Sequence, residues 1–366
     1  MNFSDLFRIV HNASKLFLSG RLSIKQKFHI GKFAFITKIL RRDCVRSVEI
    51  VHTLKCNCNC SFCSNDKLTE RNGLLTSGDI YSTIDKLVEY GVAGLIFIGG
   101  ETMTDKNLPG YIRYVKKKGA IPLLCTNGTL LTEKSIKELA CAGLYGVTIT
   151  VHDAISEDHD RIVGNKGALE TICNGVPLLK RYGIDVSLKT IYSRQSVESG
   201  AFGRILAMAK NFKVGLNVNP IMPVGKGFSP DNLLSDKEKV QYNYVCDKEK
   251  IITTHSKASF DNQCPAGYNY LCVMSDGEIL PCYFLPVSVG NVKEISIAEA
   301  QKRAIELGIF KNGADSCIVA MDRKFLEIVI NELYSGKYTL PVRITESPDC
   351  AGLFTRYLKD ISNGYK

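Results

Sequence analysis

Three cysteines in one short segment are the residues whose types and spacing most clearly indicate chemistry. Cys56, Cys60 and Cys63 form a C-x3-C-x2-C pattern within the segment 54–63. Three thiolates on one loop can bind three irons of a [4Fe–4S] cluster, and the fourth iron is then left without a protein ligand and can bind a small molecule. A simple electron carrier holds its cluster with four cysteines and offers no such position. The spacing therefore favours a cluster that takes part in catalysis.

Zinc and unligated thiols are the alternatives for this segment. A tetrahedral zinc site usually needs a second ligand pair roughly 12–20 residues away. The next cysteine along the chain is Cys125, on an expected strand, so zinc is disfavoured. Cys58 lies inside the motif without a place in its spacing. We interpret Cys58 as a bystander, and an exchange of its role with Cys56 stays open.

The cysteine segment resembles the hallmark of the radical S-adenosylmethionine (radical SAM) superfamily, in which the loop follows the first strand and an aromatic residue, here Phe62, precedes the last cysteine. The resemblance implies that the open iron chelates SAM. An electron from the cluster then cleaves SAM to methionine and a 5′-deoxyadenosyl radical, which abstracts hydrogen from a substrate. It also implies an external one-electron donor of the flavodoxin or ferredoxin type.

A second motif supports this resemblance. Gly99-Gly100-Glu101-Thr102 follows the second expected strand, where the family carries a Gly-Gly-Glu-Pro segment that contacts the SAM amino group. Thr102 replaces the usual proline. Thr150 stands where many relatives have a SAM-contacting Ser or Thr. The resemblance therefore implies that Gly99, Gly100, Glu101 and Thr150 bind SAM.

A second set of cysteines follows far along the chain. Cys264 and Cys282 are spaced as C-x12-G-x4-C through Gly277, on an expected hairpin, and this resembles the start of the SPASM or shorter twitch auxiliary-cluster extension. The dense cysteine run of a full SPASM domain is missing. Only Cys317 and Cys350 remain beyond the hairpin, so the resemblance implies one auxiliary [4Fe–4S] cluster held by these four cysteines. Cys272 as a substitute ligand, and a tail without a cluster, are the alternatives.

The elements that must position these motifs alternate along the chain. Short β-rich runs are each followed by a helical pattern, which predicts a parallel sheet with crossover helices. Chemistry gathers at the carboxyl ends of strands in parallel barrels, and both motifs fall at such ends. The expected strands are 48–54, 95–98, 121–125, 146–151, 185–191 and 214–221, with helices near 77–90, 108–118, 133–142, 168–182 and 203–211.

Six such units predict an α/β fold with a partial (β/α)6 TIM-like barrel. The alternation stops near residue 230, and the remainder is less regular. We therefore expect an N-terminal helical arm over 1–46, the radical SAM partial barrel over 47–230, and a SPASM/twitch-like domain over 231–366.

The charge of the chain lies mainly in the arm. The first 42 residues hold nine of the 47 basic residues and one of the 37 acidic ones, which accounts for +8 of the net +10. Apolar residues recur there at helical spacing. We expect short amphipathic helices that pack on the main domain or contact an anionic membrane surface. Nucleic-acid binding is not expected, because no binding motif accompanies the charge.

Length and composition exclude other classes. A chain of 366 residues with 45% hydrophobic residues can bury a large core without disulfides. No apolar run approaches the roughly 18–20 residues of a membrane span, and no signal peptide is recognised, so a cytoplasmic protein is expected, with peripheral attachment to the membrane as an alternative. In that compartment, the 14 cysteines are ligands or buried thiols rather than disulfides.

The function expected from these observations is reductive cleavage of SAM, followed by oxidation or bond formation on a small metabolite or a peptide. A lipid-linked substrate at a membrane surface is an alternative. A non-catalytic iron–sulfur carrier or scaffold is the alternative from another class, although such a protein needs neither an open iron nor a Gly-Gly-Glu segment.

Overall fold

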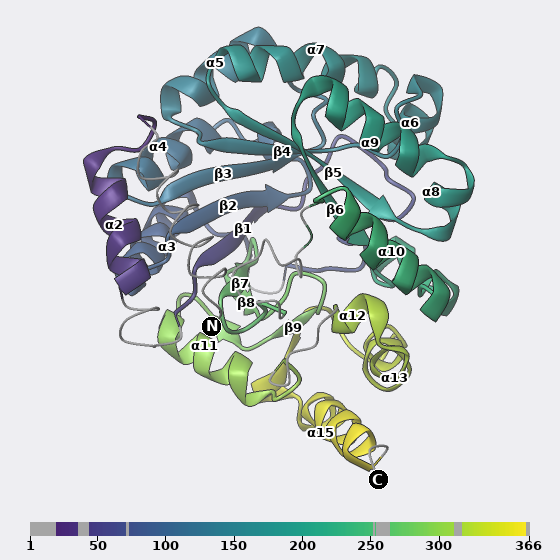
Figure 1. The fold of residues 1–366 in the computed structure, drawn as a ribbon. Helices are drawn as coiled ribbons and strands as arrows, with labels where there is room; N and C mark the ends of the chain where they lie inside the picture. The colour runs from purple at the N-terminus through teal and green to yellow at the C-terminus, as the bar shows by residue number, and fades with distance from the viewer. Residues whose placement is uncertain are drawn as a thin grey trace.

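The barrel strands form one parallel sheet in chain order. The computed structural model describes residues 20–35, 44–70, 73–251, 253, 264–310 and 317–363. Within them, β1 to β6 lie side by side, each parallel to its neighbours, as Figure 1 shows. The open (β/α)6 architecture expected from the sequence is confirmed. The strands are β1 (Ser47–Thr53), β2 (Gly94–Gly99), β3 (Ile121–Thr126), β4 (Gly146–Thr150), β5 (Asp185–Tyr192) and β6 (Gly215–Pro220).

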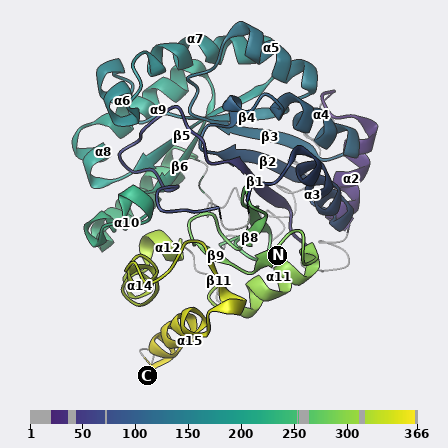
Figure 2. The same ribbon diagram turned by 180° about the vertical axis from the view of Figure 1, so that it is seen from behind.

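Helices form an outer layer around the curved sheet (Figure 2). They begin and end on local signals: Thr76 and Thr132 start their helices with capping boxes, and Gly91 ends the first one in a left-handed conformation, with φ of 115°. Apolar side chains of both layers are fully buried between them. The helices are α3 (Ser77–Tyr90), α4 (Leu108–Lys118), α5 (Glu133–Ala142), α6 (Ser156–Val163), α7 (Ala168–Arg181), α8 (Arg194–Glu198) and α9 (Ala201–Phe212).

The C-terminal part adds strands to the same sheet. β7 (Tyr270–Val273) and β8 (Glu278–Leu280) form the expected hairpin, and β7 also pairs in parallel with β1. β10 (Gly290–Asn291) then pairs with β8. The sheet therefore continues past residue 230, where the sequence predicted a domain boundary. This pairing covers the outer edge of β1 and brings the second cysteine set toward the first.

Most of the remaining elements pack below or beside the hairpin in Figure 1, whereas the first helix after β6 lies near that strand. A small two-stranded sheet joins β9 (Val287–Ser288) to β11 (Val342–Arg343). Arg343 forms a buried ion pair with Glu278 of β8, which links this sheet to the hairpin. The helices of this part are α10 (Asp236–Lys248), α11 (Ile297–Glu306), α12 (Ile318–Met321), α13 (Arg323–Phe325), α14 (Asn331–Leu333) and α15 (Pro348–Asn363).

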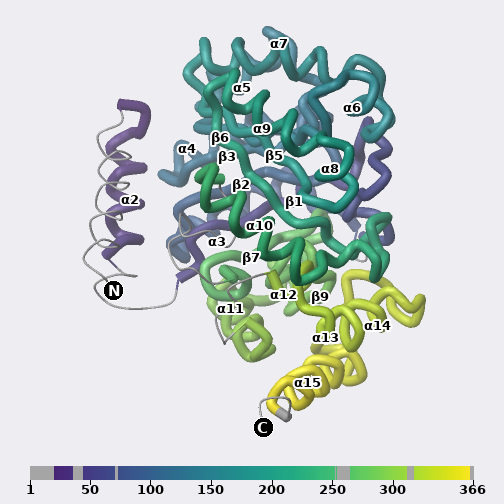
Figure 3. Tube along the Cα trace, turned by 45° about the vertical axis from the view of Figure 1, so that its right-hand side comes forward, coloured from purple at the N-terminus to yellow at the C-terminus, as the bar shows by residue number. Residues whose placement is uncertain are grey.

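The described part of the N-terminal arm lies across the amino ends of the strands. Helix α2 (Ile24–Ala34) lies at this end of the barrel and stands apart from the strands in Figure 3. The buried Gln26 amide donates a hydrogen bond to the carbonyl of Ala120, 2.9 Å away and just before β3. Arg21 forms an ion pair with Asp185, the first residue of β5. The arm segments 1–19 and 36–43 lie outside the described residues.

Candidate functional site

The cysteine loop follows β1 directly, and two neighbouring segments hold its backbone. The Glu101 amide donates to the carbonyl of Lys55 over 2.7 Å, which ties the loop to the segment after β2. The backbone amide of Asn59 donates to the carbonyl of Val163, at the end of α6, over 2.9 Å. Backbone bonds of this kind fix the path of a loop that has no regular structure of its own.

The segment after β6 holds the loop from a third side. The Lys226 amide donates to the carbonyl of Cys63 over 2.9 Å. A Cβ atom at the preceding Gly225 would lie 2.2 Å from that carbonyl oxygen. The glycine therefore permits a contact that a larger residue would block. Residues 220–227, with the sequence PIMPVGKG, therefore pack against the cysteine loop.

The two glycines of the Gly-Gly-Glu segment lie against the other side of the loop. A Cβ atom at Gly99 would lie 2.2 Å from the carbonyl oxygen of Thr53, and one at Gly100 would lie 2.2 Å from that of Lys55. No side chain fits at either position without moving the cysteine loop. The close packing explains why this motif and the cysteine motif occur together.

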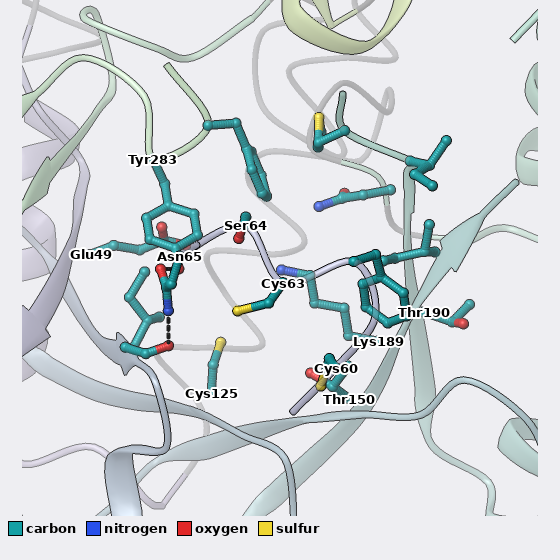
Figure 4. Close-up of a pocket in the computed structure, with 18 of the residues that line it drawn as sticks. Glu49, Cys60, Cys63, Ser64, Asn65, Cys125, Thr150, Lys189, Thr190 and Tyr283 are labelled. Atoms are coloured by element: carbon teal, nitrogen blue, oxygen red, sulfur yellow. Dashed lines mark hydrogen bonds between the residues drawn. The ribbon is translucent and has the colours of Figure 1, made fainter. Parts of the chain in front are cut away.

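A cavity of about 300 Å³ opens at the carboxyl ends of the strands, and both cysteine sets line it (Figure 4). In the close-up, the sulfurs of Cys63 and Cys125 point into the same space. The structure brings the predicted residues Cys56, Cys60, Cys63, Gly99, Gly100, Thr150, Cys264, Cys282 and Cys317 to this cavity. Residues more than 200 positions apart therefore face one space.

Glu101 is placed differently from the expectation. It is fully buried and is not among the described residues that line the cavity. Its carboxylate accepts hydrogen bonds from the Thr126 hydroxyl over 2.6 Å and from the backbone amides of Asn127 over 2.7 Å and Met103 over 2.9 Å. Burial nevertheless raises the pKa of the Glu101 carboxyl. In this structure Glu101 ties the loop after β2 to the loop after β3, and its contact with SAM stays a prediction.

Cys350 is likewise not brought to the cavity. It lies on α15, is fully buried in the hydrophobic core, and is not among the described lining residues. Cys264, Cys282 and Cys317 are close enough to interact electrostatically, and after burial the Cys317 charge further raises the pKa of Cys264 to about 12. The structure therefore gathers three of the four predicted auxiliary ligands, and the role of Cys350 stays a prediction.

The three thiols of the loop are of the residue type that an iron–sulfur cluster needs. Within the parts of the chain that the structure describes, no three His, Cys, Asp or Glu side chains meet around one point at metal-binding distances. A [4Fe–4S] cluster needs no such point, because each thiolate binds a different iron at a different corner. Cys56, Cys60 and Cys63 would hold one cluster, and the glycine backbone beside them leaves space for its ligand.

Two buried histidines support the cysteine loop from β4 and α6. The ring of Phe62 packs edge-on against His152, with centroids 4.4 Å apart. The backbone amide of His152 donates to Nδ1 of His159 over 3.1 Å. Burial, followed by the charges of His159 and Lys189, lowers the pKa of His152 to about 3. His152 is therefore neutral and packs beside the cysteine loop as an uncharged ring.

Several residues at the cavity were not predicted from the sequence. The Tyr283 hydroxyl donates to Oδ1 of Asn65, and Nδ2 of the Asn65 side chain donates to the carbonyl of Gly99 over 3.1 Å. Glu49 of β1 and Lys189 of β5 also line the cavity. A charged side chain within a strand was the signal available for these two, and the sequence does not show which space such a side chain faces.

Comparisons with known proteins agree with this arrangement. The model of the radical SAM superfamily matches residues 50–193, which include the cysteine loop and β1 to β5. The model of an iron–sulfur cluster-binding domain, SPASM, matches residues 264–318, which include Cys264, Cys282 and Cys317. Each match contains one of the two cysteine sets that line the cavity.

Among curated proteins, the chain is similar to an AdoMet-dependent heme synthase of Methanosarcina barkeri, with 27% identity over 69% of this chain and 80% of the relative. It is also similar to a PqqA peptide cyclase of Granulibacter bethesdensis, with 26% identity over 69% of this chain and 71% of the relative. Both relatives are enzymes by name. This finding favours an enzyme over the alternative of a non-catalytic iron–sulfur carrier.

Solved structures share the fold. SuiB of Streptococcus suis, bound to the precursor peptide SuiA, gives a TM-score of 0.57 at 15% identity, over 75% of this chain and 68% of that chain. The enzyme anSMEcpe with bound AdoMet gives 0.56 at 16% identity, over 87% of this chain and all of that chain. Together with the two family matches, the chain therefore belongs to the radical SAM superfamily, as an enzyme that uses SAM with a [4Fe–4S] cluster and carries a C-terminal SPASM domain for an auxiliary cluster.

Proposed function

We propose that the chain oxidises, or forms a new bond in, a small metabolite or a peptide residue that enters the cavity between the two cysteine sets. The observation that carries the proposal is that Cys60 and Cys63 face the same cavity as Cys264, Cys282 and Cys317. A substrate in this cavity would touch both sites. The relatives named for heme synthesis and for peptide cyclisation support both substrate classes.

The residues that line the cavity have different roles in this proposal. Cys56, Cys60 and Cys63 hold the catalytic cluster, and Gly99, Gly100 and Thr150 line the place for SAM. The cluster, when bound, supplies the electron that cleaves SAM and so generates the radical that takes a hydrogen atom from the substrate. The largely apolar wall, with Phe62, Ile98 and Met222, excludes water and so protects a radical from side reactions.

The cysteine loop also offers a route for an external electron. Cys56 is exposed, and so are its neighbours Lys55 and Asn57. A one-electron donor of the flavodoxin or ferredoxin type would approach the cluster at this exposed edge. The basic side chain of Lys55 favours an acidic donor surface.

Anaerobic reconstitution with iron and sulfide tests the enzymatic proposal. With dithionite and SAM, the wild-type protein forms 5′-deoxyadenosine, and Cys60→Ala forms none because its cluster lacks one of three ligands. Cys141→Ala is the matched control, since Cys141 is exposed on α5 away from the cavity, and it cleaves SAM like the wild type. An iron-loaded wild-type protein that leaves SAM intact contradicts the proposal.

A contact with an anionic membrane through α2 is a second proposal. Ile24 and Phe28 lie one turn apart on α2 and are 87% and 75% exposed, beside the basic residues Lys25 and Lys27. An exposed apolar stripe with basic flanks fits an anionic lipid surface. Because α2 lies at the amino ends of the strands, the contact would tether the enzyme rather than deliver a lipid to the cavity. Within the described residues, no helix has the length and apolar character to span a bilayer.

Sedimentation with vesicles tests this contact. The wild type is expected to bind phosphatidylserine-containing vesicles and not neutral ones, and the double variant Ile24→Ser/Phe28→Ser is expected to lose binding. Its free energy of unfolding should stay within about 0.5 kcal/mol of the wild type, because both side chains are exposed. Val240→Ser, at a 69% exposed position of α10, should bind normally. Equal binding by the double variant contradicts the proposal.

A further inference from the structure

Lys226 contacts the cysteine loop through both its backbone and the tip of its side chain. Its backbone amide donates a hydrogen bond to the carbonyl of Cys63 over 2.9 Å, and its ammonium group donates to Oδ1 of Asn59. The side chain therefore bridges the segment 59–63, which contains the predicted cluster ligand Cys60. Lys226 is exposed and is not among the described residues that line the cavity, so its place is outside the space for SAM and substrate.

The glycines on either side hold Lys226 against the loop. Gly225 has a left-handed conformation, with φ of 59°, and a Cβ atom there would lie 2.2 Å from the carbonyl oxygen of Cys63. A Cβ atom at Gly227 would lie 3.7 Å from that of Phe62, which belongs to the same loop. Glycine permits this close approach of two backbones. The backbone of Lys226 therefore cannot move away from the loop as freely as that of a lysine in an exposed turn.

The charge of Lys226 has no acidic partner. Among the described residues, no carboxylate oxygen lies within 4.0 Å of its ammonium group. Its charge reaches the neighbouring thiol: burial is the main reason why the pKa of Cys60 is raised to about 11, and the charge of Lys226 opposes this rise. A positive charge therefore stands beside a predicted cluster ligand, outside the cavity.

We propose that Lys226 raises the reduction potential of the SAM-binding cluster and so helps an external donor to reduce it. Reduction transfers one electron from the donor to the cluster, which adds one negative charge beside Lys226 and breaks no bond. Net charge is one of the factors that set the potential of a cluster, and a nearby cation stabilises the more negative, reduced state. Lys226 acts through its charge and is not a catalytic residue. The inference rests on the proposed function, because it concerns the cluster that is proposed to cleave SAM.

The test measures the potential of this cluster in the anaerobically reconstituted holoenzyme. Samples are poised at fixed potentials with redox mediators and dithionite. EPR spectroscopy then follows the reduced cluster whose signal changes when SAM is added. Lys226→Met removes the charge at similar length, Lys226→Arg keeps it, and Lys137→Met, at an exposed position of α5, is the matched control. Iron content is measured on each preparation, and Lys226→Gln replaces Lys226→Met if the latter does not load iron.

The inference predicts that removal of the charge makes the cluster harder to reduce. At a fixed potential, the ratio of reduced to oxidised cluster should be at least threefold lower in Lys226→Met than in the wild type, which is about 30 mV for a one-electron couple. Lys226→Arg and Lys137→Met should differ from the wild type by less than this. The inference is overturned if Lys226→Met also stays within this limit. It is overturned as well if Lys226→Arg falls as far as Lys226→Met, because the effect would then not depend on the charge.

The hydrogen bond to Asn59 gives a second, milder variant. Asn59→Ala keeps the charge of Lys226 but removes the oxygen that holds it at the loop. The ratio of reduced to oxidised cluster should therefore lie between those of the wild type and Lys226→Met. If neither Lys226→Met nor Lys226→Gln binds the cluster, Lys226 is a structural requirement of the loop and the inference is overturned.

The potential is measured without SAM cleavage, so the two proposals fail separately. A cluster whose potential depends on the charge of Lys226, in a protein that leaves SAM intact, contradicts the proposed function alone. A protein that cleaves SAM, with the same potential in the wild type and Lys226→Met, contradicts this inference alone.

Discussion

Single side chains connect the two cysteine sets of this enzyme. Tyr283 follows the predicted auxiliary ligand Cys282, and its hydroxyl binds Asn65, two residues after Cys63. Asn65 in turn holds the carbonyl of Gly99, at the predicted SAM site. The position of the predicted SAM-binding backbone therefore depends on a residue of the C-terminal part.

Loss of this connection should weaken SAM binding. Asn65→Ala removes the hydrogen bond to the Gly99 carbonyl and one of the partners of the Tyr283 hydroxyl, and a buried group that loses its partner costs about 1–3 kcal/mol. We expect the Kd for SAM to rise about tenfold in Asn65→Ala, and less in Tyr283→Phe, which keeps the bond to Gly99. Equilibrium binding to the reconstituted protein measures the change.

Tyr244→Phe controls for the loss of a hydroxyl group, since Tyr244 is 63% exposed on α10 and should bind SAM normally. A Kd for Asn65→Ala within twofold of the wild type would show that the connection does not position the site.

Spacing made it predictable that Cys56, Cys60 and Cys63 lie together at the cavity, because a motif on one loop depends on the local chain alone. The cavity-lining residues Glu49 and Lys189 were not predicted as a pair. Each is one charged residue in a strand, and whether both face one cavity depends on the curvature of the sheet between β1 and β5. Glu101 shows the same limit, since its motif was recognised but its buried hydrogen bonds depend on the loop after β3.

At the scale of elements, the loops after β1, β4 and β6 form one packed unit around the cysteines. His152, just after β4, is one group of this unit whose protonation makes stability depend on pH. Its pKa of about 3 in the folded protein lies below the value of about 6.5 in an unfolded chain. The folded state therefore keeps His152 neutral while the unfolded state takes up a proton as the pH falls below about 6.5.

The free energy of unfolding should therefore decrease as the pH falls, because only the unfolded chain protonates His152. Between pH 7 and pH 5, its contribution to the free energy of unfolding should decrease by about 2 kcal/mol. His152→Gln should show a correspondingly smaller decrease than the wild type in urea unfolding of the iron-free protein. Identical pH dependence of the two proteins would contradict the low pKa of His152.

The alternation of strands and helices was predictable because each unit carries its own signals, such as the capping residue Thr76 and the terminal glycine Gly91. The parallel pairing of β7 with β1 was not predictable in the same way. It joins residues more than 200 positions apart, and a four-residue strand has no local feature that selects its partner.

At the scale of the whole molecule, the nine-stranded sheet explains how the two cysteine sets, the predicted metal sites, line one cavity. β1 leads into the catalytic loop, and β7, paired with β1, leads into the hairpin that ends at Cys282. The arm helix α2 lies at the opposite ends of the strands, away from the chemistry. The basic residues of α2 are therefore separated from the predicted site of SAM cleavage.

Iron content of the reconstituted variant that lacks Cys56, Cys60 and Cys63 tests this two-site arrangement most directly. The wild type should bind about eight irons as two [4Fe–4S] clusters, and the triple alanine variant should keep about four irons in a cluster that Cys264 and Cys282 hold. Mössbauer spectra count the irons and identify the cluster type. A triple variant that holds no [4Fe–4S] cluster would contradict an auxiliary site in this cavity.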